Sequence, residues 1–271
     1  MAITTNRTRP ESIISNRKGE TMKNKIEQNM TVAELVVRDP HLRQRLEQLG
    51  IDYCCGGKKS LLAAVEAAGL QWPAVESALN AALAKKEEQA ATDWNTVALS
   101  TLADHIVDTH HAFMKEQLPR LDELLTKVQN AHGAQHGDML GKLQKTYSAI
   151  RSELEAHLMK EEQVLFPAVK GIDAFLAGTG ERPVVHCGSV VHPIQQMELE
   201  HDAAGDELAV MRKLTGGYQL PPDACQTFAA LYEGLVAMEA DLHEHIHLEN
   251  NILFPKSVEL EAEMINGKAQ I

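Results

Sequence analysis

The sequence is short of aromatic residues, of cysteine and of long apolar runs. Aromatic residues make up 4% of its 271 residues, although 44% are hydrophobic, and together with abundant Ala, Leu and Glu this favours helices over sheet. No apolar run approaches the roughly 20 residues that a membrane-spanning helix needs, and the polar first 25 residues lack the apolar core of a secretory signal. We therefore expect an all-α, cytoplasmic protein.

Basic residues are also few: the chain has 26 Lys and Arg against 38 Asp and Glu, which gives a net charge of -12. An acidic chain of this kind argues against binding to nucleic acid or to an anionic membrane surface. Four cysteines are too few for a disulfide framework. Histidine is the unusual component, with 13 residues, several of them in a helical pattern.

The order of helix signals predicts two helical domains. Residues 1–27 read as a disordered leader, 28–88 as a small helical N-terminal domain, 95–259 as a four-helix bundle and 260–271 as a tail. In the small domain Thr31 and Glu34 form a capping box, and Asp39-Pro40 begins a further helix. In the bundle, glycine-rich breaks separate four predicted helices at about 96–130, 138–170, 192–214 and 222–258.

A repeated motif carries the chemistry. His157-x3-Glu161-x3-Leu-Phe-Pro167 is matched by His245-x3-Glu249-x3-Leu-Phe-Pro255. A His and a Glu four residues apart lie on one face of a helix. We expect each proline to end its helical core.

Heptad-like spacing places each His-Glu pair on the buried stripe of its helix. The two stripes are Leu143, Tyr147, Ile150, Leu154, His157, Glu161, Val164 and Leu231, Leu235, Met238, Leu242, His245, Glu249, Ile252. The stripes of the other two helices each contain one central histidine, His111 and His201. Burying such groups without partners costs several kcal/mol, and helix bundles commonly compensate with a di-iron centre. The predicted metal ligands are His111, His157, Glu161, His201, His245 and Glu249.

Other histidines offer competing interpretations. His243, Glu244 and His247 match a zinc-protease pattern, but their face lies about 200° from that of His245, so we expect them to be solvated or to support the site. His110 or His105 could replace His111 if the register differs. His132 and His136 read as loop residues at the surface. A second metal site at His186, Cys187 and His192 lacks a tight ligand spacing.

Two adjacent cysteines occupy a predicted turn. Gly56-Gly57 would expose the sulfurs of Cys54 and Cys55, and Lys58 and Lys59 would favour thiolates. We predict a functional thiol here and structural roles for Cys187 and Cys225.

The segment Asp52-Tyr53-Cys54-Cys55-Gly56-Gly57-Lys58, combined with both His-x3-Glu segments, resembles the iron–sulfur cluster repair proteins (the RIC family, YtfE- or ScdA-like, with DnrN- and NorA-type members that respond to nitric oxide). The resemblance implies a hemerythrin-like bundle behind an ScdA-type module, with the same six ligands. It implies two non-haem iron ions, oxo-bridged when oxidised, and nitric oxide or oxygen as small ligands. Damaged iron–sulfur proteins would be the partners.

The resemblance further implies repair of clusters after nitrosative or oxidative stress, as a metal-binding iron donor rather than an enzyme. A hemerythrin proper has a fifth histidine, but Gly205 stands four residues after His201, which predicts a vacant coordination position. Two alternatives share the site: a nitric oxide scavenger or sensor without repair activity, and an oxygen-activating di-iron enzyme, which the histidine-rich ligand set disfavours. The sequence leaves open a monomer or a homodimer.

Overall fold

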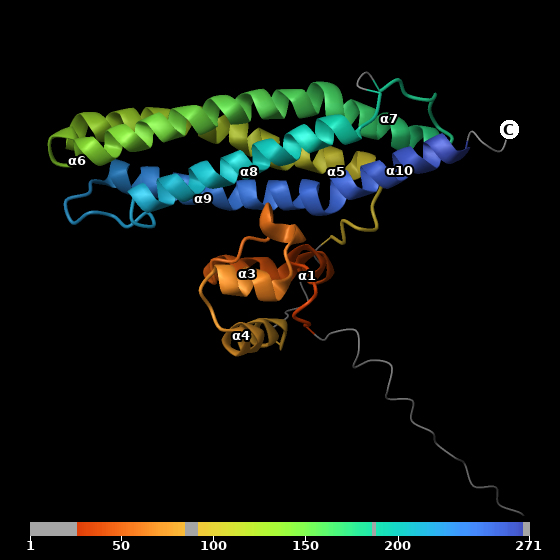
Figure 1. Cartoon of the computed structure of the whole chain (residues 1–271). Coiled ribbons are helices and arrows are strands. Elements are labelled where there is room, and N and C mark those ends of the chain that lie inside the picture. The colour runs from red at the N-terminus through yellow and green to blue at the C-terminus, as the bar shows by residue number, and fades with distance from the viewer. Residues whose placement is uncertain (1–25, 85–91, 186–187, 268–271) are drawn as a thin grey trace, which may run out of the picture.

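A computed structural model describes residues 26–84, 92–185 and 188–267 of the chain. A long helical bundle lies beside a small N-terminal helical module (Figure 1), and the predicted all-α class is confirmed. Outside the described ranges lie residues 1–25 of the leader predicted at 1–27, together with His186, Cys187 and residues 268–271. Within those ranges, every helix is too short or too polar to cross a membrane.

The N-terminal module consists of short helices, and its starts follow the sequence signals. The side chains of Thr31 and Glu34 each accept a hydrogen bond from the other's backbone N–H, at 3.1 and 2.8 Å. Gly50 and Gly69 follow helix ends with φ of 68° and 69°, a conformation that glycine adopts without strain. The elements are α1 (Val32–Arg38), η1 (Pro40–Leu42), α2 (Arg43–Gln48), η2 (Gly56–Lys58), α3 (Leu61–Ala67) and α4 (Trp72–Ala84).

The bundle is built from long helices in which three π-helical turns are embedded. Its elements are α5 (Leu99–Ile106), η3 (Val107–His111), α6 (Ala112–Lys160), η4 (Glu161–Leu165), α7 (Phe166–Leu176), α8 (Val191–Leu214), α9 (Gln226–Leu248), η5 (Glu249–Leu253) and α10 (Phe254–Asn266). The π turns are η3, η4 and η5. Each contains a predicted ligand, and π turns often mark functional sites.

Helix α6 reverses direction within its own span, so it supplies two arms of the bundle. The Tyr147 hydroxyl donates a hydrogen bond to the Leu118 carbonyl at 2.6 Å, whereas a straight helix would separate these residues by about 43 Å at 1.5 Å per residue. Figure 1 shows the reversal at the end of the bundle farthest from the C-terminus. The predicted loop near His132 and His136 is therefore a bend whose residues keep helical geometry.

The prolines after the His-x3-Glu motifs do not end their helices, as the sequence had suggested. Pro167 and Pro255 lie in the first turns of α7 and α10, which continue to Leu176 and Asn266. Because proline cannot donate the regular helical hydrogen bond, the ladder changes register at the preceding π turn. In η4 this shift leaves Val164 43% exposed and buries Leu165 instead, so Val164 was wrongly assigned to the buried stripe.

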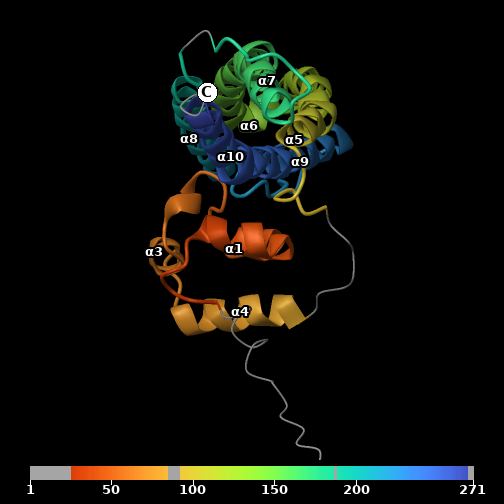
Figure 2. The ribbon, with the colours of Figure 1, turned by 90° about the vertical axis from the view of Figure 1, so that its right-hand side faces the viewer.

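The module packs on the bundle beside α9 and η5 (Figures 1 and 2). Arg43 forms an ion pair with Glu244 at 2.8 Å, and the Asn251 amide donates to the Tyr53 carbonyl at 3.0 Å. A Cβ atom on Gly57 would lie 2.8 Å from the Asn251 side-chain oxygen, so a larger residue here would displace the Asn251 side chain. The contacts hold the Cys-Cys turn against the bundle.

Candidate metal centre

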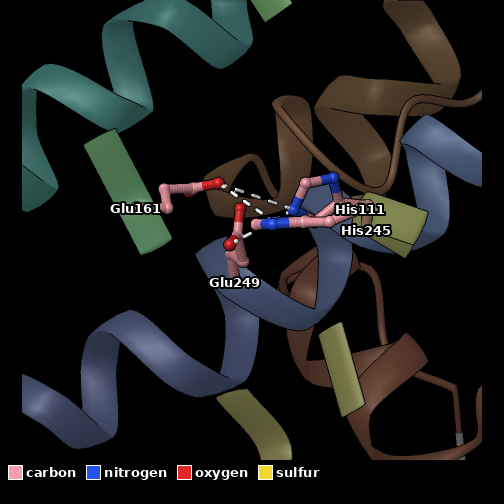
Figure 3. Close-up of side chains that lie close together, drawn as sticks. All are labelled: His111, Glu161, His245 and Glu249. Carbon is pink, nitrogen blue, oxygen red and sulfur yellow. Dashed lines mark ion pairs between the residues drawn. The ribbon is translucent and has the colours of Figure 1, made fainter. Parts of the chain in front are cut away.

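The six predicted ligands come together in the interior of the bundle. His157 lies near the end of α6, His201 in α8 and His245 in α9, while His111, Glu161 and Glu249 belong to the three π turns. Each of the six residues is at most 3% exposed. Figure 3 shows four of them, His111, Glu161, His245 and Glu249, pointing toward one another.

The side chains form two ligand sets that share both carboxylates. The first ligand set is His111, His245, Glu161 and Glu249, and the second is His157, His201, Glu161 and Glu249; within each set the donor atoms lie within 4.8 Å of one another. Each set takes one histidine from each helical hairpin. The sequence motifs did not reveal this pairing, because the two motif histidines, His157 and His245, belong to different sets and each shares its set with a histidine of the other hairpin.

Each carboxylate presents one oxygen to each set. Glu161 Oε2 lies 3.4 Å from His111 Nε2, while its Oε1 lies 3.2 Å from His157 Nε2. Glu249 Oε1 lies 3.3 Å from His245 Nε2, and its Oε2 lies 3.2 Å from His201 Nε2. This is the arrangement that two bridging carboxylates need to link two cations.

The buried carboxylates lack hydrogen-bond donors. Among the described residues, both oxygens of Glu161 and of Glu249 and the Nε2 atoms of His111 and His245 have no hydrogen-bond partner. Buried charge of this kind is expensive unless it is paired or coordinates a metal. Histidine nitrogen and carboxylate oxygen are ligands that suit iron and zinc. The donor set therefore fits metal ions, and two cations would satisfy the atoms left without partners.

Three of the four histidines are oriented from behind by a second polar group. His111 Nδ1 lies 2.7 Å from a Glu162 oxygen, and His157 Nδ1 lies 2.8 Å from a Glu200 oxygen. His201 Nδ1 lies 2.9 Å from Asn250 Oδ1. Such partners fix the ring and turn Nε2 toward the centre, where the Nε2 atoms of His157 and His201 lie 3.1 Å apart. Sequence reasoning missed these residues, although Glu162 and Asn250 each follow a ligand glutamate directly.

The supporting carboxylates remain charged. Partial burial opposes the ionisation of Glu200, but hydrogen bonds from Lys160, Gln196 and His157 outweigh it and lower its pKa to about 2. Burial likewise opposes ionisation of Glu162, and hydrogen bonds from Lys115 and His111 lower its pKa. Both carboxylates can therefore accept a hydrogen bond from a neutral metal-bound imidazole, which increases its donor strength.

The competing histidines occupy other environments. His247 is buried, so of the two expected environments the solvated one is wrong for this residue. Its ring lies 5.7 Å from the Tyr53 ring, and His243 packs on the same tyrosine. Burial lowers the pKa of His247 to about 3. His110 contacts Asp241 at 3.0 Å, while His105 stacks on a tryptophan.

The remaining candidate residues lie outside both ligand sets. His136 contacts Asp223 at 3.0 Å near the α6 bend, and His132 lies 4.0 Å from the same carboxylate. His192 is exposed at the start of α8. Cys225 is exposed rather than structurally packed, and a hydrogen bond with His132 lowers its pKa to about 7.

The Cys-Cys turn lies directly against the second ligand set. Cys55 Sγ lies 3.3 Å from the His201 carbonyl, and a Cβ atom on Gly205 would be 3.6 Å from the same sulfur. The Asn250 amide, whose oxygen contacts His201, donates to the Cys54 carbonyl at 3.4 Å. Cys54 is 5% exposed, so the turn does not expose both sulfurs as the glycines had suggested. The hydrogen bond with Cys55, burial and the nearby Asp52 charge raise the pKa of Cys54, which contradicts the expected thiolate.

Comparisons with known proteins agree with this arrangement. Residues 102–257 match the Hemerythrin HHE cation binding domain, and residues 28–83 match ScdA_N, a domain of unknown function. The chain is 38% identical over 227 residues to the iron-sulfur cluster repair protein YtfE of Salmonella schwarzengrund, covering 84% of this chain and 96% of the relative. It is 37% identical over 228 residues to a probable iron-sulfur cluster repair protein of Haemophilus influenzae, covering 83% and 95%.

Proposed function

The chain belongs to the YtfE-type iron–sulfur cluster repair family, and on this premise we propose that it restores damaged clusters by supplying iron from a two-iron centre. Glu161 and Glu249 would bridge the two ions. His111 and His245 would complete one coordination sphere, and His157 and His201 the other. The observation that carries the proposal is the pair of buried carboxylates that face both ligand sets and whose four oxygens have no hydrogen-bond partner in the described part of the chain.

The surroundings of the second ligand set support a role in iron supply. Four neutral imidazoles and two carboxylates carry less negative charge than a carboxylate-rich ligand set. They would therefore bind ferrous ions less tightly, which favours release of the iron. Gly205 offers no fifth histidine one turn beyond His201, so the vacant coordination position would lie on that side, next to Cys55, and would accept a small ligand such as nitric oxide or oxygen. When bound, iron would coordinate that small ligand. The same iron would be what the protein delivers to a damaged cluster.

We further propose that the protein acts in the cytoplasm on iron–sulfur proteins damaged by nitrosative or oxidative stress. Cys54, Cys55 and Cys225, the cysteines that lie in the described residues, are all free thiols, which suits a reducing compartment. The role is that of an iron donor rather than of an enzyme with a turnover site.

An anaerobic repair assay tests this function. The iron-loaded protein is mixed with a hydratase whose exposed cluster has been damaged by nitric oxide, and recovery of hydratase activity is measured together with the iron content of both proteins. We expect recovery that consumes iron from the loaded protein, and no recovery with the metal-free protein. Stoichiometric nitric oxide binding without recovery would instead support a scavenger or sensor.

A further inference from the structure

Outside the iron centre, the described residues contain one more cluster of donor atoms suited to a metal. Asp52, Cys54 and Cys55 each offer one ligand atom, and these atoms lie within 4.8 Å of one another. We propose that these three side chains form a ferrous-ion transfer site through which iron passes to or from the second ligand set. The proposal rests on the iron-supplying function proposed above.

The spacing of the sulfurs fits one tetrahedral cation. Sulfur ligands at about 2.3 Å from a tetrahedral ion lie about 3.8 Å apart, and the Cys54 and Cys55 Sγ atoms are separated by 3.8 Å. An oxygen ligand at about 2.1 Å would lie about 3.6 Å from each sulfur; Asp52 Oδ1 lies 3.2 Å from Cys54 Sγ. Adjacent cysteines rarely chelate one ion, but this turn already holds their sulfurs at the required distance.

Backbone hydrogen bonds hold the three donors together. Asp52 Oδ1 accepts from the N–H groups of Cys54 and Cys55 at 2.9 and 3.1 Å, and Oδ2 accepts from Gly56 at 2.8 Å. The carboxylate is thereby fixed against the turn. The N–H donors occupy both lone pairs of Oδ1, which also accepts from Cys54 Sγ–H, and Oδ2 keeps one lone pair for a cation. Two thiolates and a carboxylate form a donor set that suits a borderline-soft divalent ion such as Fe²⁺.

The cluster lies between two cavities and the backbone of the helix that carries His201. Cys54, Cys55 and Asp202 line both a cavity of 1080 Å³ and a cavity of 380 Å³. The larger cavity is also lined by Glu47, by Asp206 and by Glu239, which pairs with Arg212. Its acidic groups outnumber its basic ones, Lys59 and Arg212, and this favours cations. On the inner side, Cys55 Sγ lies against the His201 carbonyl at 3.3 Å. A cation entering from the cavities therefore meets the cluster before it reaches the second ligand set.

Transfer through this site is ligand exchange without oxidation or reduction. An Fe²⁺ ion that binds here displaces the two thiol protons, which pass to solvent, and forms bonds to both sulfurs and to one Asp52 oxygen. On leaving, the ion exchanges these bonds for others and the thiols are protonated again. Iron stays ferrous throughout.

Cobalt titration of the full-length, iron-loaded protein tests the site. We expect one additional Co²⁺ ion per chain, with a thiolate-to-cobalt charge-transfer band and loss of protons to the buffer. Cys54→Ser and Cys55→Ser should each weaken or abolish the band, and Asp52→Asn should lower the affinity by about 10-fold or more. The control is a Cys187→Ser, Cys225→Ser double variant, which should keep the band. Absence of the additional ion, or a band unchanged in Cys54→Ser and Cys55→Ser, would overturn the site.

A second measurement addresses transfer itself. Cys55 is only partly buried, so Cys55→Ser should fold and keep both irons, which metal analysis and thermal melting verify. We expect release of iron to a ferrous chelator to slow by about 10-fold in this variant, a change in the range seen when metal-site partners are removed. An unchanged rate would overturn the transfer role. Failure of the wild-type repair assay would contradict the proposed function, whereas the cobalt result decides the site independently.

Discussion

The two ligand sets contain the same donors but differ in what surrounds them. In the first set, His111 is supported by Glu162, while His245 stacks with His110 at 5.6 Å, and its Nδ1 has no hydrogen-bond partner among the described residues. In the second set, both histidines have partners, and one of these, Asn250, also contacts the Cys-Cys turn of the N-terminal module.

A repeated sequence can therefore build a centre with two unequal metal positions. The repeat places His157 and His245 in equivalent registers, but the N-terminal module packs against only one side of the bundle. The second set is therefore the one joined to the module, to the thiols and to the cavities. We expect the ion in the second set to exchange first.

Removing a shared carboxylate should have the largest effect, because it removes a ligand from both sets at once. Glu161→Leu or Glu249→Leu takes one oxygen from each set, so we expect both ions to be lost. Metal analysis of anaerobically purified protein measures this loss, with exposed Glu155→Leu as the control. Retention of both ions in both variants would refute the bridging assignment.

Removing one supporting carboxylate should affect one set only. Glu200→Gln weakens the support of His157, and Glu162→Gln weakens that of His111, so each should lower the affinity for one ion by about 10- to 100-fold. Competition with a ferrous chelator resolves two phases of iron release. We expect Glu200→Gln to accelerate the early phase and Glu162→Gln the late phase. If both variants accelerate the same phase, the two positions are not independent.

Regular helix periodicity was sufficient to predict the six buried side chains. A stripe repeating every three to four residues selects one face, and this reasoning favoured His111 over His110 and His245 over His243 without reference to the fold. The same periodicity failed at Val164 in the π turn η4, although Ile252, at the equivalent position of η5, is 4% exposed as predicted. The π turn leaves no mark in a pattern of hydrophobicity, although the proline just beyond it was visible.

Contacts between distant segments could not be predicted from local pattern. Asn250 and Cys54 are separated by 196 residues, and nothing in either segment alone indicates the other. The division of the histidines between the two sets has the same origin, because it depends on how the hairpins pack. Glu200 illustrates a related limit: a glutamate beside a ligand looks like an ordinary surface residue until its partner His157 is placed.

The smallest effect is expected at Asn250, where the second set meets the module. Asn250→Ala removes both the contact with His201 Nδ1 and the hydrogen bond to the Cys54 carbonyl. Asn250→Asp keeps an acceptor for His201 but loses the amide donor. We expect several-fold faster thiol modification of Cys54 in both variants, measured with a thiol reagent on the iron-loaded protein.

Iron release separates the two variants, because only Asn250→Ala loses support for the imidazole. Early-phase release to a chelator should accelerate a few-fold in Asn250→Ala and stay at or below the parent rate in Asn250→Asp, since a carboxylate partner strengthens a metal-bound histidine. Asn251→Ala is the matched control: it removes the neighbouring hydrogen bond to the module without touching His201. Equal acceleration of iron release in Asn251→Ala and Asn250→Ala would mean that module docking, rather than the Asn250–His201 contact, governs the second set.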